Sequence, residues 1–481
     1  MPTVIWFRQD LRLADNPALA AAMAQADTLI PVYIHAPAAE APWAAGGASQ
    51  WWLHHSLRSL REDLRQRGSE LIIRAAPDAG AELLSIAHEM QANRIVWNRR
   101  YEPAAITRDA RIKSMLRSQN LQCESFNGAL LHEPWEVKTK TGGHYQVFTP
   151  FWRQCLSLAD PAPPLPAPDN LAAPTRWPHS AALEDLNLLP RIAWDTGITA
   201  AWKPGSTAAH ARLHDFLERR AGAYAHARDR PDIEGTSKMS PHLHLGEISP
   251  REIWHAVRDQ ARGGQATDWR GSRFLTEIGW REFAHHLLYH FPETPLQPLR
   301  ANFARFPWQD RPDLLRAWQR GMTGYPIVDA GMRQLWQTGW MHNRVRMIVA
   351  SFLVKDLRIA WQEGARWFWD TLVDADLASN SLGWQWSAGC GADAAPYFRI
   401  FNPVSQGKKF DAEGDYVRKF LPEISSLSND WIHEPWNAPP ESLRAAGITL
   451  GTTYPLPMVD HRQARELALA ALTTLKNNGV L

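Results

Sequence analysis

Short β-branched runs alternate with helical patterns over the first ~130 residues and then disappear. The runs occupy residues 3–7, 28–35, 70–75 and 94–98, and the helical patterns occupy 17–25, 50–68, 80–90 and 103–118. Such runs are typical of buried parallel strands, and their alternation with helices builds βαβ units. No G-x-G-x-x-G or G-x-x-x-x-G-K-[ST] motif follows a run, so the usual dinucleotide and P-loop sites are excluded here. The pattern predicts an α/β N-terminal domain with a Rossmann-like, doubly wound parallel sheet.

The rest of the chain has a different pattern. Seven prolines fall within residues 161–178, which favours an extended connector. From Ala208 onward helical periodicity replaces the β-rich runs, and there is no repeat of fixed period. We therefore expect an α/β domain at 1–132, an interdomain connector at 133–207 and a larger all-α domain at 208–481.

Composition excludes several classes of protein. Hydrophobic residues make up 45% of the 481 residues and charged residues 21%, as in an ordinary soluble globular protein. The N-terminus has no signal-peptide pattern, and no apolar run reaches the ~18 residues of a membrane span. Cys123, Cys155 and Cys390 lack the spacing of a disulfide framework or a zinc site. We expect a cytoplasmic protein without metal or membrane association.

The net charge of +2 neither requires nor excludes a nucleic-acid partner, because a local basic patch is enough to bind phosphates. Two basic clusters are interleaved with acidic residues, and either one alone is typical of a solvated surface. The clusters are Arg219, Arg220, Arg228 and Arg230, and Arg399, Lys408, Lys409, Arg418 and Lys419.

Tryptophan is unusually frequent: the chain has 24, and eleven of them lie between residues 269 and 386. An indole packs as a large apolar group and stacks well on flat heterocycles. It can also carry a one-electron hole. Most of these tryptophans are expected to be packing residues, and a few are candidates for chemistry.

Residues 235–250 place Gly235, small hydroxylated residues and Lys238 ahead of a helical segment. Backbone N–H groups, hydroxyls and a helix N-terminus together suit an anion such as a pyrophosphate, although Ser or Thr before a helix is more often only an N-cap. His242 and His244 are too close for a helical metal pair and lack acidic or cysteine partners at ligand spacing. The segment therefore indicates an anion site and no metal site.

Three further motifs combine carboxylates, amides and indoles. EIGWREF at 277–283 places a carboxylate and an indole one helical turn apart, and WMHNRVRM at 340–347 does the same for Asn343 and Met347. The third motif is DADLASNSLGWQW at 374–386, followed by RIFNP at 399–403. Together with WFRQDLR at 6–12 and DNP at 15–17, they resemble the photolyase/cryptochrome family over essentially the whole chain. The resemblance is greatest to bacterial cyclobutane pyrimidine dimer photolyases.

The resemblance implies an antenna-binding α/β domain and an all-α domain that holds FAD in a U shape. Arg344 matches the arginine paired with Asp376, and Asn380 matches the position facing flavin N5, where an amide can donate or accept. Trp384, Trp361 and Trp308 match the proximal, middle and distal electron-transfer tryptophans. The residues that match cofactor-binding positions are Tyr224, Thr236, Ser237, Lys238, Met239, Ser240, Arg281, Trp340, Arg344, Asp374, Ala375, Asp376 and Asn380.

The resemblance also implies light-driven repair of cyclobutane pyrimidine dimers, by electron transfer from excited, reduced FAD to a flipped-out dimer. Trp280 and Trp386 match the indoles that stack on the flipped bases. Glu277 and Asn343 match the polar pair at the pyrimidine edges, and Met347 matches an apolar wall. Members that act on (6-4) photoproducts carry histidine at the position of Asn343, so the asparagine favours the cyclobutane dimer. The expected contacts to damaged DNA are Arg228, Glu277, Trp280, Asn343, Trp386, Arg399, Lys408 and Lys409.

The antenna site departs from the family pattern. Residues 101–105 have alanines where one folate-binding branch has Asn-Glu, whereas 98–103 and 131–134 resemble photolyases close to plant cryptochromes. This favours methenyltetrahydrofolate as the antenna chromophore, with deazaflavin, flavin mononucleotide or no antenna as alternatives. Phe274 stands where close relatives often have another tryptophan near the cavity.

Other functions stay open at this stage: a cryptochrome-type blue-light photoreceptor, a (6-4) photolyase, or a Trp-rich binding module without light chemistry. Signalling members usually carry a long C-terminal extension, whereas this chain ends at Leu481, soon after the helical region. The presence of Glu277, Trp280, Asn343 and Trp386 also favours repair. We therefore expect a deoxyribodipyrimidine photo-lyase that acts as a monomer, reaches the nucleoid through DNA and needs no protein partner.

Overall fold

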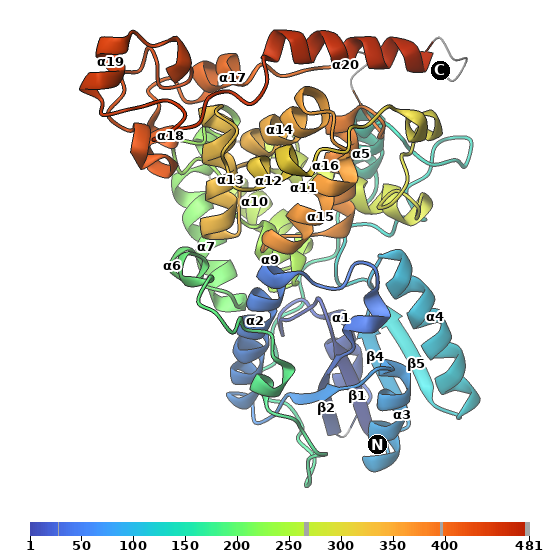
Figure 1. Ribbon diagram of the computed structural model, residues 1–481. Helices are drawn as coiled ribbons and strands as arrows, with labels where there is room; N and C mark the ends of the chain where they lie inside the picture. Colours follow the sequence, from blue (N-terminus) through green and yellow to red (C-terminus); the bar gives the residue numbers. More distant parts are fainter. Residues whose placement is uncertain (27, 264–268, 395–397, 477–481) are drawn as a thin grey trace. The chain divides into compact units, whose positions relative to one another are not determined.

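The computed structural model describes residues 1–26, 28–263, 269–394 and 398–476 (Figure 1). Spatial contacts divide the chain into two compact units. The first comprises residues 1–222, 237–292 and 373–378, and the second comprises 223–236, 293–372 and 379–481. This division is based on spatial contacts and does not test the boundaries expected at residues 132 and 207, which stay predictions.

The first unit contains a five-stranded parallel sheet with the strand order β3-β2-β1-β4-β5. Its strands are β1 (Pro2–Phe7), β2 (Thr28–His35), β3 (Ile72–Ala75), β4 (Arg94–Asn98) and β5 (Gln122–Phe126). The chain winds outward from β1 in both directions, which confirms the predicted doubly wound sheet. The edge strand β5 is absent from the sequence prediction, because exposed Gln122 and Glu124 interrupt its apolar run.

Helices α3 (Ala79–Glu89) and α4 (Pro103–Ser118) pack against one face of this sheet (Figure 1). Val4 and Trp6 of β1 point into that core, where they meet side chains of both helices. Successive strand residues face opposite sides, so buried Ile5 and Phe7 belong to the other face. Helix α1 (Pro17–Met23) contacts β1, β4 and β5.

Further helices of the first unit lie outside the βαβ pattern. Helix α5 lies inside the predicted connector and contacts α11, while residues 158–182 contain no helix or strand. Helix α5 was not expected, because the predicted connector is rich in proline. These helices are α5 (Phe148–Ser157), α6 (Thr196–Ala201), α7 (Ser206–Arg219), α9 (Ser240–His244), α10 (Pro250–Gly263) and α11 (Arg273–His290). Helix α2 (Gly47–Arg65), by contrast, belongs to the pattern, because it connects the parallel strands β2 and β3.

The regular elements among the described residues of the second unit are helices, apart from an isolated bridge between Leu450 and Tyr454, which confirms the predicted all-α part. A π-helical turn, η5 (Phe352–Asp356), continues directly from α14. None of the described helices combines the length and the apolar character needed to cross a bilayer. The helices are α8 (Tyr224–Ala227), α12 (Pro312–Gln319), α13 (Pro326–Thr338), α14 (Asn343–Ser351), α15 (Trp361–Thr371), α16 (Leu377–Ala388), α17 (Pro403–Phe410), α18 (Asp415–Phe420), α19 (Pro440–Ala445) and α20 (His461–Leu475).

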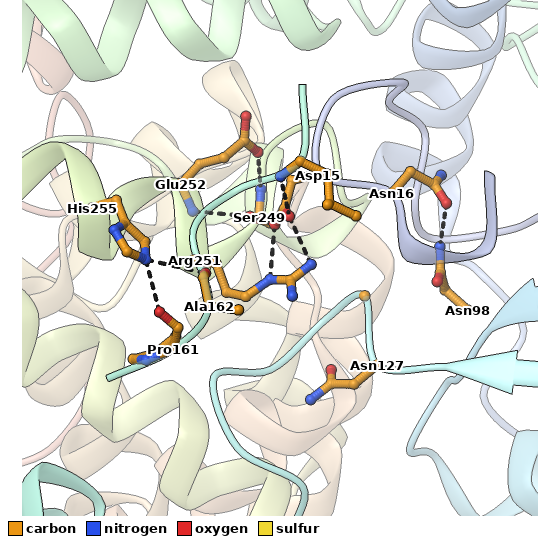
Figure 2. Close-up of polar contacts among 12 residues, drawn as sticks. Asp15, Asn16, Asn98, Asn127, Pro161, Ala162, Ser249, Arg251, Glu252 and His255 are labelled. Carbon is orange, nitrogen blue, oxygen red and sulfur yellow. Dashed lines mark hydrogen bonds and ion pairs between the residues drawn. The ribbon is translucent and has the colours of Figure 1, made fainter. Parts of the chain in front are cut away.

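A buried carboxylate ties the N-terminal sequence motif to helix α10 within the first unit (Figure 2). Asp15 is fully buried, and Arg251 donates to its two oxygens at 2.6 and 3.0 Å. Ser249 Oγ donates to the same carboxylate at 2.5 Å. His255 of α10 donates from Nε2 to the carbonyl of Pro161 at 2.9 Å. The D-N-P motif and the proline-rich segment therefore hold the start of α10.

The segment that precedes α10 also approaches the end of β1. Gly246 has a left-handed φ of +66°, and a Cβ there would lie 2.2 Å from the carbonyl oxygen of Gln9. Arg12 donates to the Gly246 carbonyl at 2.9 Å, and the Leu11 N–H donates to the Leu245 carbonyl at 3.1 Å. Only glycine permits this close approach.

Candidate functional site

The predicted anion-binding segment leads into the five-residue helix α9. Thr236 and Ser237 are partly exposed and Met239 is buried. Lys238 has a left-handed φ of +51°, so the backbone turns sharply before the helix. Ser240 Oγ donates to Asp374 Oδ2 at 2.5 Å. This hydrogen bond joins two predicted cofactor residues from distant parts of the sequence, and buried Ala375 follows directly.

A buried glutamate anchors the chain just after α9. Glu247 is fully buried and accepts hydrogen bonds from Trp52 Nε1 at 3.0 Å and from the Gly205 N–H at 2.6 Å. It also accepts from Ser56 Oγ and is paired with His242 of α9. These partners compensate for the burial of its charge. Residues from α2 and from the loop before α7 thereby fix α9 in place.

Asp376 lies beside a histidine that was absent from the sequence prediction. His285 Nε2 is 3.5 Å from Asp376 Oδ2, and His285 Nδ1 is 3.0 Å from the carbonyl oxygen of Arg281. Because a carbonyl only accepts, Nδ1 carries the proton in the neutral imidazole and Nε2 faces the carboxylate as an acceptor. Burial lowers the pKa of His285, and Asp376 opposes this effect. Near neutral pH two acceptors converge here, which suits a ligand that donates hydrogen bonds.

Helix α11 carries predicted substrate and cofactor residues. Glu277 and Trp280 lie one turn apart, and both are partly exposed. The Trp280 ring stacks on Phe148 with a centroid distance of 3.9 Å and an interplanar angle of 8°. Arg281 donates to the carbonyl of Ala129 at 2.7 Å. One face of the indole is thus fixed by protein, as a platform for a flat ligand requires.

Helix α14 of the second unit begins with the other predicted substrate contacts. Asn343 is exposed, and Met347 is partly exposed one turn later. Arg344 donates to Asp229 at 2.8 Å. The described ion pair of Arg344 is therefore with Asp229, and its pairing with Asp376 stays a prediction. Trp340, just before the helix, is buried.

The three predicted electron-transfer tryptophans all belong to the second unit. Trp384 and Trp361 are buried, with 2% and 1% of their surface exposed, whereas Trp308 is partly exposed. Gly364 lies one turn after Trp361 on α15, and a Cβ there would lie 2.0 Å from the Trp384 ring. Because Gly364 has no side chain, the Trp384 indole can lie directly against helix α15, which begins with Trp361.

Trp308 is tied to the same region through the backbone. The N–H of the next residue, Gln309, donates to the carbonyl of Arg358 at 2.7 Å, three residues before Trp361. The order buried, buried, partly exposed is the one that a path for an electron hole from the interior to the surface requires. Asn380 lies one turn before Trp384 on α16, and its Nδ2 donates to the carbonyl of Ala365 at 3.0 Å.

The chain is similar to known proteins over most of its length. Residues 3–169 match the family described as "DNA photolyase", and residues 274–474 match "FAD binding domain of DNA photolyase". The deoxyribodipyrimidine photo-lyase of Agrobacterium fabrum is 50% identical over 476 residues, 99% of this chain and 98% of that protein. This chain belongs to the photolyase/cryptochrome family.

Solved structures and plant relatives extend this photolyase/cryptochrome assignment. A bacterial class III photolyase from Agrobacterium tumefaciens superimposes with a TM-score of 0.95 at 50% identity, covering 99% of this chain and 98% of that one. Cryptochrome-1 of Arabidopsis thaliana is 40% identical over 98% of this chain and 70% of its own length. The resemblance inferred from the motifs is confirmed, as is a domain of the FAD-binding type.

The basic residues predicted to contact DNA differ in their surroundings within this photolyase/cryptochrome chain. Lys408 forms an ion pair with Glu434, whereas Lys409 is exposed, with its Nζ 5.1 Å from the centre of the Phe410 ring. Arg228 lies over the ring of buried Tyr224, at 5.7 Å from its centre. Lys408 is therefore partly neutralised, and Lys409 is better suited to a phosphate.

Trp386 and Arg399 come together in the second unit, where both line a small cavity with Lys355. Motif matching missed Lys355 and His285, as well as the partners Phe148 and Asp229 described above. His285 follows Arg281 by one turn and Glu277 by two, so the helical period of α11 was the signal that could have found it. Lys355 follows Met347 by two turns, so the same helical period was the signal that could have found it.

Proposed function

We propose that this protein repairs cyclobutane pyrimidine dimers in DNA by light-driven electron transfer from reduced FAD. The net reaction is redox-neutral: two carbon–carbon bonds of the cyclobutane ring break, and the electron returns to the cofactor. The observation that carries the proposal is α11, where Glu277 and a protein-backed Trp280 share one partly exposed helical face. A polar acceptor beside a stacking platform suits an extruded pyrimidine pair.

The residues present fit FAD. The hydroxyls of Thr236 and Ser237 suit a diphosphate, and the converging acceptors of His285 and Asp376 suit hydroxyl or N–H donors of the cofactor. Buried His244 Nδ1 has no partner among the described residues. Burial lowers the pKa of His244, and Asp376, Glu102 and Asp374 oppose this effect. Bound FAD would supply the light-driven electron. These side chains hold it, and buried Trp384 and Trp361 lead electrons inward.

On the DNA, we assign one role to each group of residues. Trp280 and Trp386 stack on the two flipped bases, at ~1–3 kcal/mol per base, which offsets the few kcal/mol that leaving the duplex costs. Glu277 and Asn343 bind the polar pyrimidine edges, and Met347 closes the apolar side. Arg228, Arg399, Lys408 and Lys409 bind phosphates. The protein acts as a monomer in the cytoplasm.

A dimer-containing oligonucleotide distinguishes this function from its rivals. Blue light in the presence of reduced protein should restore the unmodified pyrimidines, and the dark control should not. A blue-light photoreceptor of the cryptochrome type would bind FAD without restoring them, and a (6-4) photolyase would act only on the (6-4) product. Absence of flavin absorbance in the purified protein would leave only a binding module.

Glu277→Ala should lower the repair rate of bound dimer by about 10- to 150-fold, because it removes one hydrogen bond to a charged group, ~1.5–3 kcal/mol. FAD content should stay unchanged. Glu277→Gln keeps the shape and a hydrogen-bonding group, so we expect an intermediate rate. Single-turnover repair of pre-bound substrate measures the effect. Wild-type repair in Glu277→Ala at normal flavin content would show that the assignment to the dimer is wrong.

Trp386→Ala and Lys409→Ala should separate stacking from phosphate binding. The tryptophan variant should lower the preference for lesion over undamaged duplex by ~1–3 kcal/mol. The lysine variant should weaken both complexes equally and lower the salt slope by about one. Lys409 is preferable to Lys408, whose charge is already paired with Glu434. Affinities across a salt series measure both effects, and the reverse outcome would invert the two assignments.

We also propose methenyltetrahydrofolate as the antenna chromophore. The support is the likeness of residues 98–103 and 131–134 to photolyases close to plant cryptochromes. An absorption spectrum of the freshly purified protein tests this, because a folate antenna adds a band to those of the flavin. If denaturation released deazaflavin or flavin mononucleotide, or released no second chromophore at all, the folate assignment would be contradicted.

A further inference from the structure

A lysine is buried in the π-helical turn that follows α14. Lys355 has only 3% of its surface exposed, and its Nζ donates to the carbonyl oxygen of Arg399 at 2.7 Å. The same Nζ lies 4.1 Å from the centre of the Phe398 ring, a cation–π contact. The lysine therefore binds the backbone and the preceding side chain of a segment that carries a predicted phosphate contact.

A second side chain, one turn earlier, holds the same segment. Ser351 Oγ accepts a hydrogen bond from the Phe401 N–H at 3.2 Å. Asn343, Met347, Ser351 and Lys355 follow one another at intervals of four, so α14 and η5 run from the predicted dimer contacts to this segment. Single π-helical turns inside helices are frequent at functional sites.

A small cavity adjoins the lysine. It measures about 20 Å³ and is lined by Ser351, Lys355, Trp386, Ser387, Arg399 and Phe401, among others. Its volume has room for one water molecule, which can accept from a second N–H of the ammonium. Trp386, a predicted stacking residue, thus lines the same cavity as Lys355, which holds the backbone of Arg399.

Burial of this ammonium costs free energy relative to an apolar side chain of the same size. Burial lowers the pKa of Lys355 to about 7, with Arg399 adding to the effect and Asp356 and Cys390 opposing it. Burial raises the pKa of Cys390 to about 12, so this thiol is neutral. Asp356 is itself bound to His461 of α20 at 2.5 Å. Stability alone therefore gives no reason for a lysine here.

We propose that Lys355 is a positioning residue for DNA recognition, which holds residues 398–401 beside Trp386 so that the Arg399 guanidinium meets the phosphate next to the flipped dimer. This inference rests on the proposed function. The lysine does not touch the DNA. It acts through the Arg399 carbonyl and the Phe398 ring, and its contribution weakens when the ammonium loses its proton, because the neutral amine donates a weaker hydrogen bond and makes no cation–π contact.

The test compares Lys355→Met with wild type as full-length, FAD-containing protein. Methionine keeps the length and apolar stem but removes the donor. At pH 6.5 we expect the dissociation constants for dimer-containing and undamaged duplex to rise about fivefold, the loss of one hydrogen bond. Flavin content should stay unchanged, and the thermal midpoint should stay equal or rise, because a buried charge is removed.

The pH profile distinguishes positioning from packing. Wild-type affinity for duplex should fall as the pH rises through about 7, because the protonated lysine is the effective form. The advantage of wild type over Lys355→Met in affinity should therefore shrink above that pH, to the part that the N–H groups of the neutral amine still supply. Ser351→Ala, which removes the second tether, should weaken binding in the same direction without this pH dependence.

Lys140→Met controls for the loss of one positive charge, since Lys140 is exposed in the first unit; it should leave affinity and pH profile unchanged. A lower thermal midpoint with unchanged DNA affinity in Lys355→Met would overturn the inference, as would an affinity ratio that is constant with pH. If the wild type showed no preference for the lesion, the proposed function would fail. Weaker binding of undamaged duplex by Lys355→Met would then still support the tether.

Discussion

Trp361→Phe should reduce the rate of light-driven reduction of oxidised FAD by more than about tenfold, equivalent to at least ~1.4 kcal/mol of barrier. Phenylalanine keeps much of the packing at the start of α15 but is far harder to oxidise than indole. Repair by chemically pre-reduced enzyme should stay nearly intact. Absorbance changes of the flavin under blue light measure the first rate, and dimer repair measures the second. Trp308→Phe should behave in the same way.

Trp318→Phe is the matched control for this experiment. Trp318 is fully buried and lies 6.2 Å from Trp384, edge to face, so it is a second indole next to the proximal position. If the path runs through Trp361, photoreduction in Trp318→Phe should stay close to wild type. Photoreduction that continues in Trp361→Phe but stops in Trp318→Phe would show that electrons take the other branch. Persistence in both variants would direct attention to Trp369.

Glu247→Ala should lower the free energy of unfolding by about 3–5 kcal/mol, because it leaves a group of buried polar partners without their common acceptor. Trp52 Nε1, the Gly205 N–H and His242 would lose it together. Urea unfolding followed by far-UV circular dichroism measures the change.

Ser56→Ala is the control, since it removes one donor and leaves the acceptor in place. Its cost should be about 1 kcal/mol. Because Glu247 holds α9, and α9 begins with Ser240, FAD affinity should fall in Glu247→Ala and stay normal in Ser56→Ala. Equal stability of the two variants would contradict the view that the carboxylate is the centre of this cluster.

Much of the fold was predictable, because its signals are local. β-branched runs placed four of the five strands, and helical periodicity identified the second half as all-α. Strand β5 was missed, since an edge strand is only half buried and tolerates exposed Gln122 and Glu124. Helix α5 was missed because the proline content of its neighbourhood dominates the local composition.

The candidate site also has one part that was predictable from local sequence and one part that was not. Residue types at fixed spacing identified Glu277, Trp280, Asn343 and the tryptophans, because short motifs keep the chemistry in sequence order. Their surroundings are non-local. The stacking of Trp280 on Phe148 and the bond from Ser240 to Asp374 join residues that are far apart in the chain.

By itself, then, the sequence determined the fold class, the family and the chemical identity of the residues that we propose for flavin and DNA. Only the tertiary structure decided which groups are buried and what they face. Lys355 and His285 show the physical reason: a lysine becomes a positioning residue, and a histidine a paired acceptor, only when distant segments desolvate them and place a carbonyl or a carboxylate opposite. Both the burial of these side chains and the groups that they face depend on how the chain packs, and this cannot be deduced from the order of the residues.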